Sequence, residues 1–527
     1  MSVIKGPQYP MVAITTDKGM VGGGGGGMLE SKTHMNRDEQ DMAYFGKKQQ
    51  LKRNFGFLSI VGLSVTLMGT WESLFSAFTY GLTNGGPAGL VYGYIFCWIG
   101  TWAVTASLAE LASAIPLSGG QYNWVSYLAP QWCAKFLSYM TGWMTVLGWL
   151  AGMASLAFLG GTVIQGLLVL NYDSYVFERW HGTLLFYAVM AICLFINTVM
   201  ASWLPKVEGL MFITHIVSFF GILVPLVYFA PHGSASDVFA TFVNGGGWSS
   251  NGVSFFVGII TSVYAFVGTD SACHMAEEIQ DASTVVPWCM MTTMAINGVL
   301  GFGMLLAILF CVGDVNDALN TPTGYPFIEI FFQATESVGG ATAMTAVVAA
   351  EVIFAAVGIL ATSSRMLWAF SRDNGVPYSK YIGRVDTRTG LPLWSIMVCT
   401  VISLLLALIN IGSTAAFNAM ASLVAAGFLT SYLISIGLLL YRRYTGDKIR
   451  WGPWNMGRYG GVVNMISIVY IVISCLFSFF PGTATVTLID MNWSCVVFGA
   501  VVVFSLIFYV IYARHTFKGP VVEVHDD

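Results

Sequence analysis

Long apolar stretches separated by short polar segments dominate the chain from residue 57 onward. Twelve of them have roughly the 17–25 residues that an α-helix needs to cross a bilayer. They lie at 57–80, 87–113, 135–160, 183–204, 207–230, 253–275, 287–312, 342–368, 393–411, 415–441, 461–481 and 493–513. The pattern predicts an all-α membrane protein with twelve transmembrane helices. The further stretch Thr321–Ser337 is amphipathic and too short to span, so we expect it to lie on the surface.

Composition supports a membrane protein. Of 527 residues, 56% are apolar and 9% are charged, whereas soluble domains carry about 25% charged residues. One soluble core is excluded, because cores stop growing at about 250–300 residues. The net charge of −4 comes with no basic patch, so no nucleic-acid partner is expected. Nine scattered cysteines are typical of small buried hydrophobic residues and indicate neither disulfides nor a metal site.

The first 50 residues are polar, contain six consecutive glycines (Gly22–Gly27) and lack the apolar core of a signal peptide. We expect residues 1–50 to be a disordered tail, followed by a helical domain over 51–515 and a short tail over 516–527. The first membrane helix then serves as an uncleaved anchor.

Basic residues test the number of spans. With twelve helices, 22 of the 23 Lys and Arg residues fall on one side of the membrane, and only Arg179 falls on the other. Basic loops face the cytoplasm in membrane proteins. The distribution therefore predicts that both termini are cytoplasmic.

Two spans contain similar short motifs near their middle. The first has Gly69-Thr70 followed by Glu72, and the sixth has Gly268-Thr269-Asp270. Interrupted helices at matching positions are typical of an inverted repeat, here 57–230 and 253–441 with two additional helices over 461–513. Because glycine is common in membrane helices, a chance match remains the alternative at this point.

Several longer motifs resemble one known family. They are Asn84–Gly93 and Ala109–Pro116 around the second span, Ser118–Tyr122, Asp270-Ser271 followed by Glu277-Glu278, and Arg365–Pro377. Together they resemble the fungal amino acid/choline transporter branch of the amino acid–polyamine–organocation superfamily, over about residues 50–515. The resemblance implies the leucine-transporter fold, with a 5+5 inverted repeat and helices 1 and 6 broken at the substrate site. It also implies a secondary active permease that imports a small amine solute across the plasma membrane, with a proton or sodium as coupling ion and no other cofactor.

The candidate substrate-binding residues surround the two expected breaks: Gly69, Thr70, Trp71, Glu72, Tyr264, Gly268, Thr269 and Asp270. Exposed N–H groups at Gly69 and Gly268 would attract a carboxylate. Glu72 either holds an ammonium group or is a buried structural residue, and Asp270 either meets a cation or caps the helix that restarts there. Trp71 and Tyr264 either stack on an alkylammonium group or pack in the interior.

Two coupling ions are possible. Ser363 and Ser364 would hold sodium between helices 1 and 8, unless their hydroxyls bond their own helix. Proton-coupled relatives carry a titratable residue on helix 5, which falls on or near His215 here, and this favours a proton. A hydrogen-bonded structural histidine is the alternative. Arg365, Arg372 and Asp373 either pair with Glu277 and Glu278 across an inner gate or form a solvated face.

Three functions remain in view at this stage. An amino acid such as γ-aminobutyrate is the favoured substrate, and choline or a polyamine is the alternative. A sensor that signals without transporting would need a longer cytoplasmic extension than these tails provide. An enzyme is not expected, because His215 and His274 stand isolated in the sequence. The pattern leaves the oligomeric state open, as well as the choice between plasma and vacuolar membrane.

Overall fold

The computed structural model describes residues 36–408, 416–446, 449–487 and 491–520, and the predictions for 1–35 and 521–527 lie outside this part. Its membrane helices coincide with the twelve predicted stretches. In chain order they are α2–α3 (Phe57–Met68, Thr70–Thr83), α4 (Gly86–Ala114), α6 (Gln131–Asn171), α7 (Arg179–Thr198), α8 (Leu204–Phe229), α10–α12 (Asn251–Gly258, Ile260–Ala265, Ser271–His274), α13 (Ala282–Phe310), α16 (Val338–Arg372), α18 (Leu393–Ala407), α20 (Ala416–Thr445), α21 (Gly460–Ser478) and α22 (Ser494–Phe508). Within the described ranges, ten segments are long and apolar enough to span a membrane, and Asn251–Ala265 and Leu393–Ala407 are shorter.

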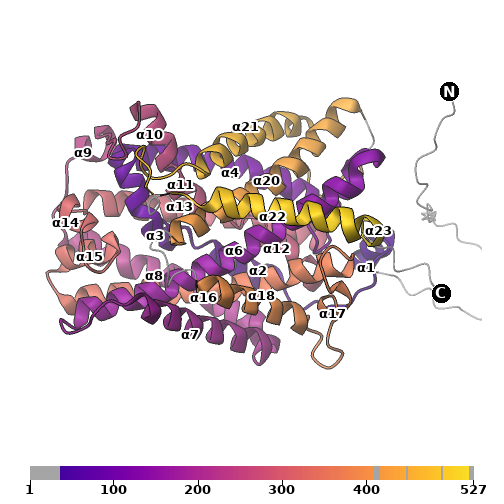
Figure 1. Cartoon of the computed structure of the whole chain (residues 1–527), viewed down its shortest axis with the longest axis horizontal. Helices are drawn as coiled ribbons and strands as arrows, with labels where there is room; N and C mark the ends of the chain where they lie inside the picture. The colour runs from indigo at the N-terminus through magenta and orange to yellow at the C-terminus, as the bar shows by residue number, and fades with distance from the viewer. Residues whose placement is uncertain (1–35, 409–415, 447–448, 488–490, 521–527) are drawn as a thin grey trace, which may run out of the picture.

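Short helices connect the spans or flank the first and last of them. They are α1 (Arg37–Tyr44), α5 (Gln121–Leu128), α9 (Ala235–Ala240), α14 (Val315–Leu319), α15 (Pro326–Thr335), α17 (Ser379–Ile382) and α23 (Arg514–Thr516). In Figure 1, α1, α17 and α23 gather at one end of the bundle, and α9, α14 and α15 at the other. We call the end with α1 the inner end, because the distribution of basic residues predicts that it faces the cytoplasm.

Small residues allow the central helices to pack closely. A Cβ placed on Gly427 of α20 would lie 2.8 Å from the backbone nitrogen of Gly148 on α6. A Cβ on Gly142 of α6 would lie 2.3 Å from the ring of Phe370 on α16. Close backbone approach at small residues is the usual way in which membrane helices associate. The 41-residue helix α6 is thereby held against α16 and α20 along one side of the central region.

Helix α15 does not lie on the surface as predicted for Thr321–Ser337. Phe327 and Phe331 are buried, and the ring of Phe327 stacks on Phe75 of α3, with centroids 5.2 Å apart. Phe331 meets the same Phe75 ring edge-on at 5.8 Å. An amphipathic helix needs a partner for its apolar face, and here α3 and α16 provide it. The stretch therefore covers the outer half of the first membrane helix.

The expectation of a disordered N-terminal tail is wrong for residues 36–50. Asn36 and Glu39 form a capping box at the start of α1, with Glu39 N donating to Asn36 Oδ1 at 2.9 Å and Asn36 N donating to Glu39 Oε2 at 3.0 Å. Met42 and Phe45 are buried against the bundle. A capped helix with a buried apolar face explains the order of this segment.

Candidate functional site

The first membrane helix is broken at Gly69, between α2 and α3. Gly69 has φ 42° and ψ 53°, a left-handed conformation that glycine adopts without steric cost. Asn297 of α13 bridges the break, since its Nδ2 donates to Val65 O at 3.1 Å and its Oδ1 accepts from Thr70 N at 3.2 Å. The predicted break is confirmed, and Asn297 is the residue that satisfies the backbone groups on both sides of it.

The sixth membrane helix is broken at the matching place. Helix α11 ends at Ala265, α12 begins at Ser271, and Gly268 between them has φ 85°. The two breaks are joined directly, because the Thr70 hydroxyl donates to Ala265 O at 2.9 Å. Ser271 Oγ also lies 3.1 Å from Ser64 Oγ of α2. The paired breaks confirm the predicted fold and place irregular backbone side by side at the centre of the bundle.

A small cavity of about 20 Å³ lies beside these breaks. It is lined by residues of α2, α3, α6, α11, α16 and α20 and of the 266–270 segment: Leu67, Met68, Ser73, Trp149, Gly152, Leu156, Tyr264, Val267, Gly268, Ile359, Val424 and Phe428. None of these described residues is charged. Small-molecule sites typically enclose about 300–1,000 Å³, so the cavity is nearly closed in this conformation and would have to widen to admit a solute. Its wall is largely apolar, which suits a solute with an apolar part.

Three aromatic side chains give the cavity its chemical character. Trp149, Tyr264 and Phe428 present their rings, and aromatic faces attract alkylammonium groups. The Tyr264 hydroxyl lies 2.8 Å from Ser155 Oγ. The indole Nε1 of Trp149 is buried and has no hydrogen-bond partner among the described residues.

The structure separates the predicted substrate residues into two groups. Tyr264 and Gly268 line the cavity, and Gly69 directly follows the cavity residue Met68. Thr269 instead lies with its hydroxyl 2.6 Å from that of Thr105. Thr70 is engaged at the breaks, as described above. Sequence reasoning located the breaks but did not identify the α6, α16 and α20 residues that complete the wall, because they come from distant parts of the chain.

Trp71 and Glu72 point away from the cavity. Trp71 is buried and packs 5.7 Å from the ring of His215 on α8. Glu72 Oε1 lies 2.7 Å from His215 Nδ1. Each helical residue turns about 100° from the preceding one, so with Ser73 facing the cavity, Glu72 faces α8. This geometry does not support the interpretation of Glu72 as the ammonium ligand.

Glu351 of α16 completes a buried cluster with Glu72 and His215. One ligand atom from each of the three residues lies within 4.8 Å of the others. Glu351 Oε1 also accepts from Ser218 Oγ at 2.8 Å. The sequence separates these residues widely, so the expectation of an isolated His215 is wrong in space. Titratable groups inside a membrane bundle are candidates for a functional site, and these three converge on one point.

A buried acid on α8, Glu208, was missed by sequence reasoning. The Glu208 side chain is fully buried, and its only described hydrogen bond is at 3.5 Å from Thr66 Oγ1 of α2. It has no ion-pair partner among the described residues, and its Oε1 lies toward Gly358 of α16. Glu208 lies near the start of the predicted span 207–230. The buried stripe of α8 would have revealed it: Leu204, Glu208, Met211, His215, Phe219, Ile222 and Leu226.

The two candidate sodium ligands on α16 already have partners. Ser363 Oγ donates to Ile359 O at 2.6 Å and approaches Trp149 O at 3.3 Å. Ser364 Oγ donates to Ala361 O at 2.8 Å. Both hydroxyls bond their own helix, which is the alternative that the sequence left open.

Asp270 is engaged by side chains from three helices. Its Oδ1 accepts from the Tyr432 hydroxyl at 2.5 Å, and its Oδ2 accepts from Gln121 Nε2 at 2.7 Å. His274 Nε2 lies 3.0 Å from Oδ2. Asp270 makes no side-chain capping bond to α12, so the capping interpretation is wrong. The histidine that looked isolated in the sequence is therefore part of a buried acid–base pair.

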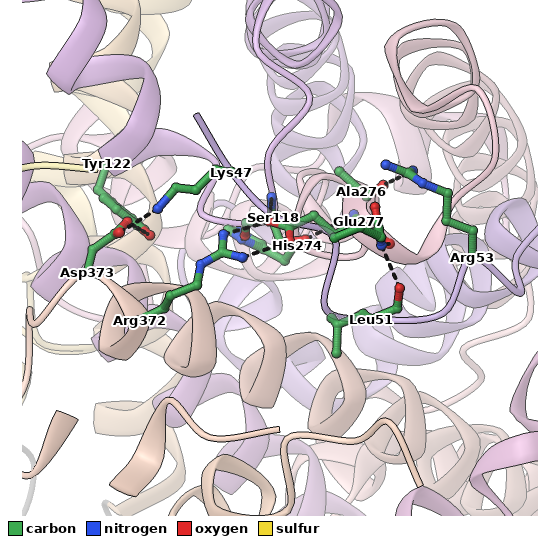
Figure 2. Close-up of polar contacts among 11 residues, drawn as sticks. Lys47, Leu51, Arg53, Ser118, Tyr122, His274, Ala276, Glu277, Arg372 and Asp373 are labelled. Atoms are coloured by element: carbon green, nitrogen blue, oxygen red, sulfur yellow. Dashed lines mark hydrogen bonds and ion pairs between the residues drawn. The ribbon is translucent and has the colours of Figure 1, made fainter. Parts of the chain in front are cut away.

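Buried ion pairs close the inner end of the bundle (Figure 2). Arg372 of α16 donates to both carboxylate oxygens of Glu277, at 2.9 and 2.8 Å. Arg365 Nε donates to Glu278 Oε1 at 2.7 Å. Of the two alternatives for these residues, the structure thus supports the gate and not the solvated face. The inner gate comprises the Arg372–Glu277 and Arg365–Glu278 ion pairs together with the contacts that Asp373 makes with Lys47 and Tyr122.

A family model described as amino acid permease matches residues 55–501, which is most of the chain. The chain belongs to the amino acid permease family. This permease is a multi-pass membrane transporter and not an enzyme. It is 30% identical over 438 residues to a putative amino acid/polyamine transporter of Macrophomina phaseolina, covering 82% of this chain and 96% of the relative. It is 31% identical over 463 residues to a choline transporter of Saccharomyces cerevisiae (87% and 81%). It is also 28% identical over 501 residues to a GABA-specific permease of the same yeast (93% and 87%).

In the permease, the N-terminal segment is part of the inner gate. Lys47 Nζ lies 2.6 Å from Asp373 Oδ1, and both side chains are fully buried. The Tyr122 hydroxyl donates to the other oxygen of Asp373 at 2.8 Å. Burial and the neighbouring Asp373 carboxylate raise the pKa of Tyr122 well above its usual value, so the phenol keeps the proton that it donates. No sequence pattern predicted that Lys47 would be buried, because the segment that carries it was expected to be disordered.

The same segment continues along the end of the sixth membrane helix (Figure 2). Gln49 Nε2 donates to Glu277 O at 2.7 Å, and Arg53 donates to Ala276 O at 3.1 Å and to Ile279 O. Phe55 N donates to Glu278 O at 3.0 Å. These bonds tie residues 47–55 to the stretch that follows α12. Opening the inner gate therefore requires the N-terminal segment to move.

Proposed function

We propose that the permease is a proton-coupled importer of a small amine-bearing solute, with an amino acid such as γ-aminobutyrate as its substrate. One observation carries the proposal. An uncharged, aromatic-lined cavity lies at two paired helix breaks, and buried titratable groups surround those breaks on the α8 side.

The cavity favours a solute with both a carboxylate and an ammonium group. The N–H groups in the first turn of α3 that Asn297 does not bind, and the unpaired Nε1 of Trp149, suit an anionic group. The rings of Trp149, Tyr264 and Phe428 suit the cationic end. Choline is the second candidate, because three rings and no carboxylate in the wall also fit a quaternary ammonium. Choline, however, would leave the N–H donors without a partner, which costs free energy.

The coupling ion in this proposal is a proton. An ionised carboxylate without a partner is costly in a low-dielectric interior, so Glu208 is a suitable carrier of a transported proton. The Glu72–His215–Glu351 cluster is the second candidate on the same helix face. Sodium is the second candidate ion, because the hydroxyls of Ser363 and Ser364 donate their hydrogens to backbone carbonyls and keep lone pairs that suit a cation.

A competition panel tests the substrate. The purified permease in proteoliposomes would be assayed for exchange of radiolabelled γ-aminobutyrate and, in parallel, of radiolabelled choline. Unlabelled amino acids, choline and polyamines would serve as competitors. Competition of γ-aminobutyrate by other amino acids, without competition by choline, supports the amino acid assignment. Exchange of choline alone favours the second candidate. No exchange of any solute contradicts transport and favours the sensor.

We also propose that both termini face the cytoplasm, as the basic residues predict. Single cysteines at the exposed positions Asp317 and Lys380 test this. In intact cells, a membrane-impermeant maleimide should label Asp317→Cys and leave Lys380→Cys unlabelled until the cells are opened. The reverse pattern contradicts the orientation.

A further inference from the structure

Asp270 and His274 form a buried pair on one face of the sixth membrane helix. Both side chains are fully buried, and His274 Nε2 lies 3.0 Å from Asp270 Oδ2. The other ring nitrogen, Nδ1, lies 3.0 Å from the backbone carbonyl oxygen of Ser118. The imidazole is therefore fixed between a carboxylate and a carbonyl, with both ring nitrogens engaged.

These two contacts determine how many protons the pair holds. A carbonyl oxygen only accepts, so Nδ1 of His274 must carry a hydrogen. A neutral imidazole carries just one, so Nε2 would then turn a lone pair toward an ionised Asp270. Two lone pairs at this distance repel each other unless a proton lies between them. Whether that proton resides on the ring or on the carboxylate, the pair holds one proton more than a neutral histidine and an ionised aspartate.

Neighbouring groups support a proton at this place. The Tyr432 hydroxyl of α20 and the amide of Gln121 on α5 both donate to Asp270. Cys273 lies beside the pair on α12, where its Sγ contacts Met290 of α13. Among the described residues, no lysine or arginine pairs with Asp270, and Arg372 at the neighbouring gate binds Glu277. The extra proton is therefore what balances the buried carboxylate.

The pair connects the inner gate to the solute cavity. Ser118 N donates to Glu277 Oε1 at 3.4 Å, and Glu277 N donates to Ser118 Oγ at 3.1 Å. Figure 2 shows Ser118 and His274 beside the Arg372–Glu277 ion pair. On the other side, the cavity residue Trp149 meets the His274 ring edge-on at 5.4 Å. Movement of Glu277 at the gate would therefore also move Ser118, whose backbone carbonyl accepts from His274 Nδ1.

We propose that Asp270 and His274 are a proton-binding site of the permease, separate from the groups on α8, which holds its proton while the inner gate is closed and releases it when the gate opens. The proposal rests on the proposed proton-coupled function and deepens it. Opening would separate Ser118 from His274 and admit water to the pair. Nε2 could then lose its proton to the inner side. Without that proton, the closed geometry is repulsive, so proton loading favours closure.

A spectroscopic count tests the site without a solute. The permease with ¹⁵N-labelled histidine, in lipid bilayers at neutral pH, would be examined by NMR for its ring nitrogens and by infrared spectroscopy for protonated carboxyl groups. The signals of His274 are those absent from His274→Gln. We expect either two protonated ring nitrogens on His274 or a protonated carboxyl band that Asp270→Asn removes. A single protonated nitrogen without such a band overturns the proposal.

Transport measurements give an independent readout. Proteoliposomes containing a pH-sensitive dye would report protons moved per γ-aminobutyrate or per choline. We expect His274→Gln and Asp270→Asn to keep solute exchange and to move one proton fewer per solute. Tyr432→Phe is the matched control, because it removes a bond to the same carboxylate but leaves the pair, and its ratio should equal that of the wild type. An unchanged ratio in both variants overturns the proposal. A wild type that moves solute without protons contradicts the proposed function itself.

Discussion

His215 Nδ1 and Glu72 Oε1 lie 2.7 Å apart, and their contact joins α8 to the outer half of the broken first helix. In helix α3, Glu72 faces α8, and the next residue, Ser73, lines the cavity. A change of protonation at this contact therefore acts on the same short helix that contacts the solute. This relationship is the physical basis for coupling in our account.

The first prediction concerns Glu72. Replacing it in Glu72→Gln removes the charge opposite His215 but leaves the cavity wall intact. We expect an unaltered solute affinity and loss of accumulation driven by a proton gradient, both measured in proteoliposomes. Glu336→Gln, at an exposed position directly after α15, is the control. A loss of affinity of about ten- to hundred-fold, the size of a lost charged hydrogen bond, would instead make Glu72 a solute ligand.

The second prediction concerns Glu208. The Glu208→Gln variant has nearly the same shape as the protonated acid, so the packing against Thr66 should persist. We expect solute exchange to continue while stimulation of uptake by an inward proton gradient falls sharply. Lys206→Gln removes a charge from an exposed position on the same helix and should behave as the wild type. Full stimulation in Glu208→Gln would exclude this residue as a proton carrier.

Much of the fold and part of the site could be predicted from the sequence. Apolar length determined the spans, and Gly69 and Gly268 indicated the breaks because a left-handed backbone favours glycine. The cavity wall could not be predicted in the same way. Trp149 and Phe428 reach the cavity only through the packing of α6 against α20. The direction of individual side chains could not be predicted either. Glu72 was a candidate solute ligand, but its carboxylate faces His215 on α8.

The third prediction concerns the inner gate. Removing one member of a buried ion pair costs about 3–5 kcal/mol, so Lys47→Met should destabilise the closed gate. Alkylation of the native, buried Cys273 on α12, followed by mass spectrometry, measures the opening. We expect the rate to rise by about tenfold or more, since tenfold corresponds to about 1.4 kcal/mol.

Two variants control this experiment. Arg450 pairs with Asp41 at 2.9 Å at the same end of the molecule, but its side chain is 46% exposed. An exposed pair contributes about 0–1 kcal/mol, so Arg450→Met should leave the rate nearly unchanged. The double variant Lys47→Met/Asp373→Leu removes the unpaired charge and should recover part of the protection. Equal rates in Lys47→Met and the wild type would refute a role for Lys47 in the gate.

The fourth prediction concerns the first break. In Gly69→Ala, the added Cβ would lie 3.2 Å from Thr66 O and the residue would keep a positive φ, which costs about 1–2 kcal/mol. We expect uptake to be lost while the protein still inserts and folds, as judged by its thermal unfolding. Gly209→Ala on α8 is the matched control, because nothing lies within 4 Å of its added Cβ. Normal uptake by Gly69→Ala would show that the break tolerates a side chain.

The most direct test of the central claim is solute accumulation driven by protons alone. Wild-type proteoliposomes would receive an inward proton gradient in sodium-free buffer, with radiolabelled γ-aminobutyrate and, separately, radiolabelled choline outside. Our account predicts that one solute accumulates above its external concentration and that collapsing the gradient with a protonophore abolishes accumulation. Accumulation that is independent of the proton gradient and requires sodium would contradict our account.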